Sequence, residues 1–194
     1  MRRAIPGVLF SLFLVACGGG PTPEQEATRQ ALVNAGVVRA AVIHLSSKYE
    51  ESLLAAGADL GGDSMDWQAA AAYRETPEGR VATQFLSGFT NPMPVDAAFK
   101  RAAEIGELAK LTSELASLAL QPRGSWAAFI GETYDLRARI DQALETLQKG
   151  TKAHVLIAAR QETNIKTSAY TDSLTRARTQ GEAPKAPEGA AKTP

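Results

Sequence analysis

The sequence predicts an all-α protein, a bundle of four or five helices with a long C-terminal helix. Three observations lead to this fold class. Large apolar residues recur every three or four positions over long stretches, which is the spacing of one helix face. Threonine or serine precedes several of these stretches, as a helix-capping residue does. No run of alternating Val, Ile and Thr residues, which would predict a strand, stands out.

The first helix is expected to begin at Thr22-Pro23-Glu24-Gln25 and to reach about Ala56. Threonine is a good N-cap, proline suits the first helical position, and a glutamine three residues after the cap completes a capping box. Gly57, Gly61 and Gly62 follow the predicted end. The apolar face of this helix is expected to carry Leu32, Ala35, Val38, Val42, Leu45, Tyr49 and Leu53.

Two short helices are expected next. The first starts from a cap at Asp63 or Ser64 and is interrupted at Glu75-Thr76-Pro77. The second repeats the start of the long helix, because Thr76-Pro77-Glu78 again places a threonine cap before proline and an acid. We expect it to continue through Leu86.

A longer helix is predicted after a proline-rich turn. Asn91-Pro92-Met93-Pro94 is expected to be a turn or extended, because residues before proline avoid the helical region. The helix then runs from Val95 to the Gln121-Pro122 step. Its apolar face is expected to carry Val95, Phe99, Ala102, Ile105, Leu108, Leu111, Leu115 and Leu118.

The last helix begins after Ser125, a good N-cap, and has the strongest apolar pattern of the chain. Two interpretations are open at Gly150. The glycine either ends the helix, with Thr151 opening an antiparallel one, or is tolerated inside one helix at a cost of about 1 kcal/mol. No second helix breaker accompanies it, and an antiparallel reversal needs a loop of some length. We therefore favour one helix from Ser125 to Arg178, on the order of 80 Å long.

Small side chains dominate the expected core, because alanine is the most frequent residue. Alanine lets helices approach closely but buries little area per residue. Large side chains must supply most of the buried area, and we expect Trp67 and Trp126 to anchor the core.

The N-terminus carries the most specific motif. Arg2 and Arg3 precede an apolar run, residues 5–16, that is too short to cross a bilayer, since a span needs about 20 apolar residues. A basic start, a short apolar stretch and a small residue before the cut are typical of a secretory signal peptide. Its end, Leu14-Val15-Ala16-Cys17, resembles the lipobox of bacterial lipoproteins and contains the only cysteine of the chain. The alternative is a signal peptide cut elsewhere, with Cys17 free or buried.

The resemblance implies cleavage between Ala16 and Cys17 and acylation of Cys17, with palmitate among the lipids. Such a protein carries several acyl chains, and stable anchoring needs more than one. In this family an aspartate directly after the cysteine retains the protein in the inner membrane. Gly18 stands there in this chain, which implies the outer membrane, with the outer face of the cytoplasmic membrane as the alternative. We expect the domain to face the periplasm.

The chain is expected to divide into a signal peptide (1–16), a lipidated flexible tether (17–22), a helical domain (23–180) and a disordered Pro/Ala-rich tail (181–194). Glycines leave the tether without a preferred conformation. The tail holds several prolines and no large apolar residue, so it has nothing to bury in a core.

Composition and motifs exclude several classes of function. The 194 residues hold 21 Lys and Arg against 21 Asp and Glu, so the chain lacks the cationic excess that binds phosphate backbones, and we expect no nucleic-acid partner. One cysteine rules out an intramolecular disulfide and a cysteine-rich zinc site. No Walker, Rossmann, zinc-protease or serine-hydrolase motif occurs, so we expect neither enzymatic activity nor a cofactor.

His44 and His154 are the only histidines. Each lies beside the apolar face of a predicted long helix, so the two are candidates to face each other across the bundle and hold a metal. The Glu-x-x-His pairs of ferritin-like di-iron bundles are absent, because Ala41 and Thr151 stand three residues before the histidines. We therefore expect no metal site. The carboxylates considered with these histidines are Glu50, Glu51 and Glu162.

These observations predict a lipid-anchored, periplasm-facing envelope protein that acts as a scaffold or adaptor through its long C-terminal helix. Its expected partners are the membrane, through Cys17, and an envelope protein; the oligomeric state is left open. The alternative is a bundle that binds a small apolar ligand among Trp67, Phe85, Phe99 and Trp126. An enzyme with an unfamiliar site around the two histidines is the third hypothesis.

Overall fold

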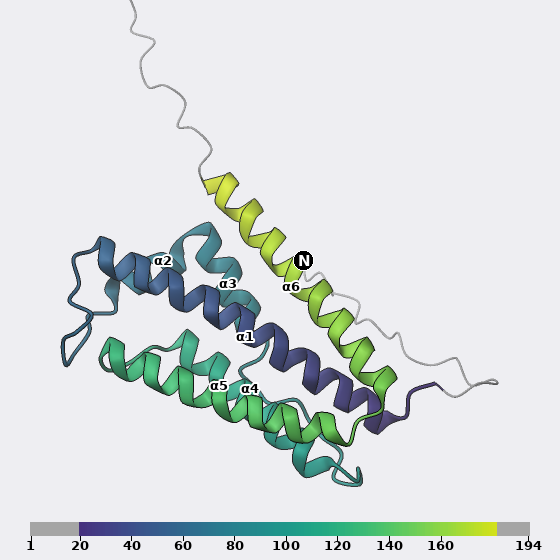
Figure 1. Ribbon diagram of the computed structural model, residues 1–194. Coiled ribbons are helices and arrows are strands. Elements are labelled where there is room, and N and C mark those ends of the chain that lie inside the picture. Colours follow the sequence, from purple (N-terminus) through teal and green to yellow (C-terminus); the bar gives the residue numbers. More distant parts are fainter. Residues whose placement is uncertain (1–19, 182–194) are drawn as a thin grey trace, which may run out of the picture.

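The structure, a computed structural model, describes residues 20–181 of the chain (Figure 1). Within that part it holds six helices and no strand, which confirms the all-α class and the long C-terminal helix. The expected four or five helices are exceeded because the chain breaks at Gly150. The helices are α1 (Pro23–Ala55), α2 (Gln68–Glu75), α3 (Pro77–Ser87), α4 (Ala102–Leu120), α5 (Trp126–Lys149) and α6 (Ala153–Gly181).

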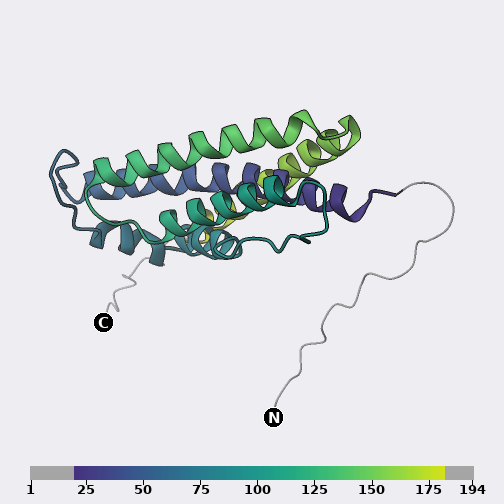
Figure 2. The same ribbon diagram turned by 90° about the horizontal axis from the view of Figure 1, so that it is seen from below.

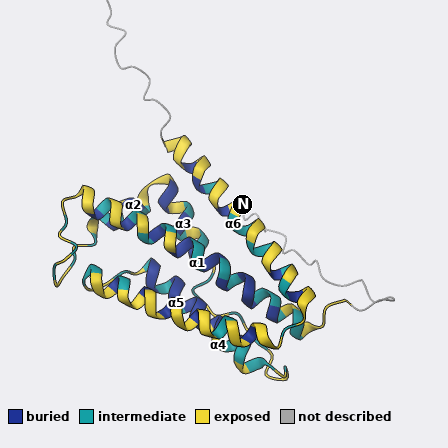
Figure 3. Ribbon diagram, viewed as in Figure 1, coloured by how far each residue is buried: buried dark blue, intermediate teal, exposed yellow. Residues whose placement is uncertain are grey.

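The first helix, α1, is the centre of the bundle. It packs against α4, α6 and α2, and α5 flanks it while packing mainly on α4 (Figures 1 and 2). Helix α1 is buried on most sides, whereas α5 and α6 each keep a broad exposed face (Figure 3). Helices α4 and α6 run in the direction of α1, and α5 runs against it. The contacts that show these directions are Glu24 with Arg101 and Tyr49 with Ala119 for α4, Arg29 with Glu162 and His44 with Tyr170 for α6, and Arg39 with Asp141 and Tyr49 with Phe129 for α5.

Three predicted helix starts are confirmed by their capping bonds. The N–H of Gln25 donates to Thr22 Oγ1 at 3.2 Å, and the N–H of Thr22 donates to Gln25 Oε1 at 3.0 Å, which is the expected capping box. Thr76 starts α3 by accepting a backbone N–H at 3.0 Å, and Ser125 starts α5 in the same way at 3.1 Å. These oxygens satisfy N–H groups that the first turn of a helix leaves without a partner.

The expected single helix from Ser125 to Arg178 is wrong. Helix α5 ends at Lys149, and α6 begins at Ala153. The two helices diverge from this link instead of packing along each other, with α1 between them (Figure 1). Residues 150–152 are enough for this reversal, since two helices can be joined by a loop of only about two to five residues.

Arg101 holds the turn between α5 and α6. Its guanidinium donates to the carbonyl of Leu147 at 2.7 Å, to the carbonyl of Thr146 at 3.0 Å and to Thr151 Oγ1 at 3.1 Å. Cations suit the last turn of a helix, where carbonyls lack intrahelical partners. A Cβ atom at Gly150 would lie 2.8 Å from this guanidinium, so the glycine permits the approach.

Two other helix starts come later than predicted. Helix α4 begins at Ala102 and not at Val95, because Asp96 accepts a backbone N–H two residues on, at 2.9 Å, and the intervening residues form turns. Helix α2 begins at Gln68, a few residues after the predicted caps, where Asp66 makes the same kind of bond at 3.0 Å. Such aspartate turns compete with helix formation over the residues they span.

Aliphatic side chains surround two fully buried aromatic rings, Tyr49 and Phe129. The hydroxyl of Tyr49 donates to the carbonyl of Ala119 at 3.1 Å, and burial raises the pKa of Tyr49 to about 12. Trp67 and Trp126, expected to anchor the core, are only partly buried. Their ring centroids lie 6.1 Å apart, and both rings pack against Phe129 from the edge of the core.

Residues 1–19 and 182–194 lie outside the described part of the chain. The signal peptide, cleavage between Ala16 and Cys17, lipid attachment at Cys17 and the disordered tail therefore stay predictions. Of the expected tether, the structure describes residues 20–22, which lead into α1. None of the helices between residues 20 and 181 combines the length and the apolar character that a membrane span requires.

Candidate functional site

A buried polar cluster joins α1, α3 and α6. Glu78, in the first turn of α3, has a side chain that is only 11% exposed. Arg178, in the last turn of α6, donates to both of its oxygens, from Nη2 to Oε1 at 2.5 Å and from Nε to Oε2 at 3.2 Å. His44 of α1 places Nε2 3.5 Å from Glu78 Oε1 and 3.4 Å from the hydroxyl of Tyr73.

Burial and neighbouring charges set the protonation states in this cluster. Burial opposes the charge on Glu78, but the hydrogen bond and the charge of Arg178 outweigh it, so the pKa of the carboxyl lies below its ordinary 4.5. Burial lowers the pKa of His44 below 6.5, against the attraction of Glu78. Near neutral pH an ionised Glu78–Arg178 pair therefore lies beside a neutral imidazole.

Tyr170 of α6 completes the cluster. Its ring stacks on Phe85 of α3 with centroids 4.5 Å apart and meets the edge of His44 at 6.1 Å. The hydroxyl of Tyr170 is buried without a hydrogen-bond partner among the described residues, and burial raises its pKa. An ion pair and a stacked ring pair together fasten α6 to α3, which makes the cluster a structural clamp.

The two histidines do not face each other. His44 contacts Tyr170, and His154 lies at the start of the same helix, about 24 Å away along its axis. His154 is exposed there, and Glu162 pairs with Arg29. Between residues 20 and 181 no group of three or more His, Cys, Asp or Glu side chains is arranged to hold a metal ion.

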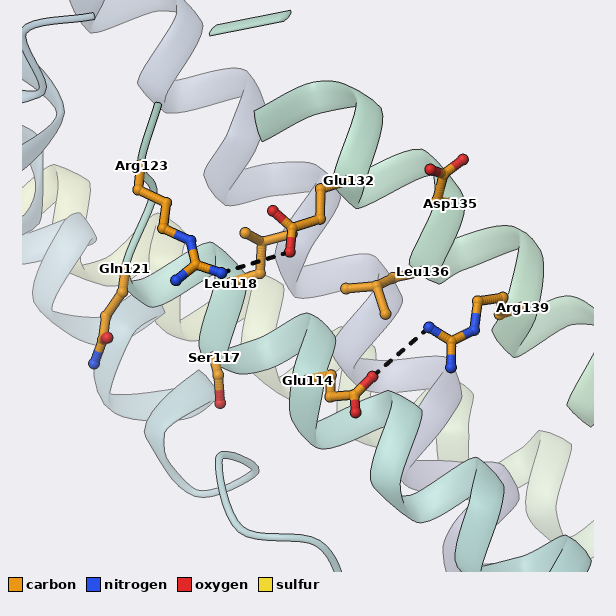
Figure 4. Close-up of a pocket in the computed structure, with 9 residues that line it drawn as sticks. All are labelled: Glu114, Ser117, Leu118, Gln121, Arg123, Glu132, Asp135, Leu136 and Arg139. Carbon is orange, nitrogen blue, oxygen red and sulfur yellow. Dashed lines mark ion pairs between the residues drawn. The ribbon is translucent and has the colours of Figure 1, made fainter. Parts of the chain in front are cut away.

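A polar hollow of about 450 Å³ lies between α4 and α5 and is called the α4/α5 groove below (Figure 4). Arg139 reaches from α5 to Glu114 of α4 at 4.0 Å, and Arg123 reaches Glu132 at 3.8 Å. The groove is lined by Glu114, Ser117, Leu118, Gln121, Arg123, Glu132, Asp135, Leu136 and Arg139.

The charges of the α4/α5 groove largely neutralise each other. Arg123 and Arg139 stand against three carboxylates, so the groove has only a weak negative field. Its ion pairs are long and lie at the surface, with side chains 40–80% exposed, and such pairs contribute roughly 0–1 kcal/mol each. Nothing in this lining selects a ligand of one charge.

A smaller hollow of about 190 Å³, the α1/α5 groove, lies between α1 and α5. Two large apolar side chains of its lining are exposed, Ile43 at 49% and Tyr134 at 62%. Trp126 and Ile130 lie deeper and are partly buried. The groove is lined by Ile43, Ser46, Ser47 and Glu50 from α1 and by Trp126, Ile130, Thr133, Tyr134 and Arg137 from α5.

The α1/α5 groove also contains polar atoms without partners. Ser46 Oγ and Arg137 Nε are both buried, and neither has a hydrogen-bond partner among residues 20–181. The guanidinium of Arg137 lies over the ring of Tyr134, 5.5 Å from its centroid. These two atoms are exceptions to the rule that buried polar atoms are hydrogen-bonded in proteins.

Comparison with known proteins assigns no relative, since no protein-family model, no curated protein and no solved structure matches the chain. Of the two grooves described above, only the α1/α5 groove combines exposed apolar side chains with buried polar atoms that have no partner among residues 20–181.

The aromatic residues expected to line a ligand pocket fall into separate groups. Trp67 and Trp126 pack on each other, whereas Phe85 stacks on Tyr170. Phe99 lies in the turns before α4. The sequence does contain a signal for the α1/α5 groove, because Trp126, Ile130 and Tyr134 recur every four residues, but Ile43 stands beside the main apolar stripe of α1 and was missed.

Proposed function

We propose that this protein is a lipid-anchored, periplasm-facing adaptor of the bacterial envelope, attached through Cys17, that binds another protein in the α1/α5 groove. The observation that carries the proposal is the exposure of Ile43 and Tyr134 at one groove. Leu54, also exposed, follows about three turns later on the same face of α1. Apolar side chains gathered on one surface are typical of interaction sites, whereas scattered ones are not.

The position of α1 fits an anchored adaptor. Pro23 begins α1 six positions after Cys17, so a tether of this length spans at most roughly 20 Å and keeps that end of the bundle near the bilayer. Ile43 and Glu50 lie roughly 30 and 40 Å further along the helix. The α1/α5 groove is thereby accessible to a protein that does not itself touch the membrane.

A protein partner fits this groove better than a small apolar ligand. Pockets that enclose small ligands measure roughly 300–1,000 Å³, whereas the α1/α5 groove holds about 190 Å³ and has an exposed rim. The larger α4/α5 groove is lined by charged residues. Size and lining thus favour a partner that covers the rim with its own side chains.

Site-specific photocrosslinking in living cells tests this function. A benzophenone amino acid replaces Tyr134, and the same probe replaces Ile165, an exposed apolar residue of α6 outside the groove, as the matched control. After illumination, adducts of each variant are isolated from the membrane fraction and identified by mass spectrometry. We expect one reproducible envelope protein to be linked from position 134 and not from position 165.

Two results would contradict the adaptor function. One is an absence of adducts at position 134, and the other is the same set of adducts at both positions. A Cys17→Ser variant serves as the second control, because loss of the anchor should lower the yield of the specific adduct without changing the fold.

A further inference from the structure

Two charged side chains stand at opposite ends of the α1/α5 groove. Because α1 and α5 run in opposite directions, Arg137 lies near Ile43, and Glu50 lies near Trp126. The seven positions from Ile43 to Glu50 span about 10 Å along α1. Neither Arg137 nor Glu50 forms an ion pair within residues 20–181, so both charges are available to a partner.

Apolar side chains fill the space between these charges. On α5, Trp126, Ile130 and Tyr134 recur every four residues and so form one row along the helix. On the facing wall Ile43 supplies the apolar contact. The groove is thus positive at one end, apolar in the middle and negative at the other.

The arrangement of the lining residues favours a helix as the occupant of the groove. Its walls are two helices whose lining residues recur every three or four positions, and such rows receive side chains with the same spacing. An amphipathic helix lying in an apolar groove is a recurrent form of peptide recognition. The described residues hold no strand and therefore no sheet edge on which an extended peptide would pair.

We propose that the α1/α5 groove binds an amphipathic α-helix of the partner protein, which carries an acidic residue for Arg137 and a basic residue for Glu50 about two turns away. This inference rests on the adaptor function proposed above and specifies the chemistry of the partner. The acid accepts the hydrogen bond of Arg137, and the apolar face of the partner helix covers Ile43 and Tyr134.

The sequence of residues 182–194 does not suit the role of this helix. The segment 182–194, EAPKAPEGAAKTP, has no large apolar residue to place against Tyr134, and its prolines interrupt any helix. A second copy of the chain is another candidate occupant, and it is tested below by its effect on the oligomeric state.

Binding of three synthetic helices tests the charge pattern. The peptides are hydrocarbon-stapled and fluorescein-labelled helices of about four turns that share one row of leucines. They differ only at two positions seven residues apart. One peptide has Glu and Lys at these positions, the second has two Glu, and the third has two Lys. Fluorescence anisotropy measures the affinity of each peptide for the protein purified from its own cells, in whatever processed form those cells produce. We expect the Glu/Lys peptide to bind roughly fivefold more tightly than the other two.

Charge reversal provides a rescue that a loss of structure cannot imitate. In Arg137→Glu both ends of the groove are acidic, so the Lys/Lys peptide should become the tightest binder. In Glu50→Lys both ends are basic, and the Glu/Glu peptide should become the tightest. Glu50 is exposed, so this variant is informative even where Arg137→Glu fails to fold.

Substitutions of exposed apolar residues locate the binding site. Tyr134→Glu should abolish binding of all three peptides, and Ile165→Glu, outside the groove, should leave the affinities unchanged. Equal affinities for the three peptides, or binding that survives Tyr134→Glu, would overturn the inference. A dimer in sedimentation that dissociates with Tyr134→Glu would also overturn it, because the groove would then hold a second copy.

The outcome separates the partner chemistry from the adaptor function. If Tyr134 is crosslinked to an envelope protein in cells while none of the peptides binds, the adaptor function stands and the helical partner is wrong. If neither crosslinks nor peptide binding are found, both proposals fail.

Discussion

Glu78 and Arg178 are separated by 100 residues in the chain and meet through two hydrogen bonds, at 2.5 and 3.2 Å. The acid lies in the first turn of α3 and the cation in the last turn of α6, so each charge also suits the end of its own helix. With Arg101 holding the turn before α6, the C-terminal helix is fastened at both of its ends.

Replacing Glu78 by Gln should lower the free energy of unfolding by about 1–3 kcal/mol, because charge-assisted hydrogen bonds to Arg178 are lost from a mostly buried site. Glu75→Gln is the matched control, since this neighbouring acid is 82% exposed and lies 4.0 Å from Arg80. Its effect should stay within about 0.5 kcal/mol. Urea unfolding followed by circular dichroism measures both. Equal effects of the two substitutions would show that the clamp does not stabilise the fold.

His44 should make the stability depend on pH. The folded protein binds the His44 proton more weakly than the unfolded chain, whose histidine has the ordinary pKa of 6.5. As the pH falls below 6.5, the unfolded state is protonated first, and the free energy of unfolding decreases until the pH passes the lower folded pKa. A His44→Gln variant lacks this contribution.

Urea unfolding of both proteins between about pH 7.5 and 5.5 checks this expectation. As the pH falls, the free energy of unfolding should decrease more for the wild type than for His44→Gln. If the two curves run parallel through this range, His44 does not titrate differently in the folded protein.

Gly79 should tolerate no side chain, because α2 and α3 approach closely there. A Cβ atom at this position would lie 2.0 Å from the carbonyl oxygen of Tyr73 and 2.8 Å from Arg74 Cα, so the backbone must move. We expect Gly79→Ala to lower the free energy of unfolding by about 1–3 kcal/mol.

Gly131 is the control for this substitution, since nothing lies within 4 Å of its Cβ position in α5. Gly131→Ala should raise the free energy of unfolding by about 0.5–1 kcal/mol, because alanine restricts the unfolded chain and favours helix. Thermal unfolding of Gly79→Ala and Gly131→Ala shows whether each substitution raises or lowers the stability. A neutral Gly79→Ala would mean that the two helices are not held at this distance.

Local sequence was sufficient to predict the three helix starts that have a side-chain cap, and insufficient to predict the starts of α2 and α4 or how the chain reverses after α5. The caps at Thr22, Thr76 and Ser125 act within a few residues, so their spacing in the sequence contains the whole interaction. The turn at Gly150 is held by Arg101, whose partner Leu147 lies 46 residues away. No local pattern reports such a bond.

The candidate site was predicted even less well than the fold. Trp126 was singled out from the sequence, but as part of the core and of an enclosed pocket. A groove forms from rows on two helices, and which rows face each other depends on the packing of α5 beside α1. Ile43 and Arg137 acquire their roles only from that packing.

The proposed lipid anchor is tested by a substitution at Cys17. A Cys17→Ser substitution removes the only thiol of the chain, so the protein should lose incorporation of labelled palmitate and leave the membrane fraction. Metabolic labelling and fractionation of the two strains measure these effects. If Cys17→Ser stays in the membrane fraction, Cys17 is not the site that anchors the protein.

The central claim is that the α1/α5 groove is the surface through which this protein binds its partner. Its most direct test is quantitative co-purification of the crosslinked partner with wild type, Tyr134→Glu and Ile165→Glu from membrane extracts. Both substitutions change exposed side chains, so each should alter the free energy of unfolding by no more than about 0.5 kcal/mol. We expect Tyr134→Glu to lose the partner and Ile165→Glu to retain it. Equal recovery of the partner with all three proteins would contradict binding in the α1/α5 groove.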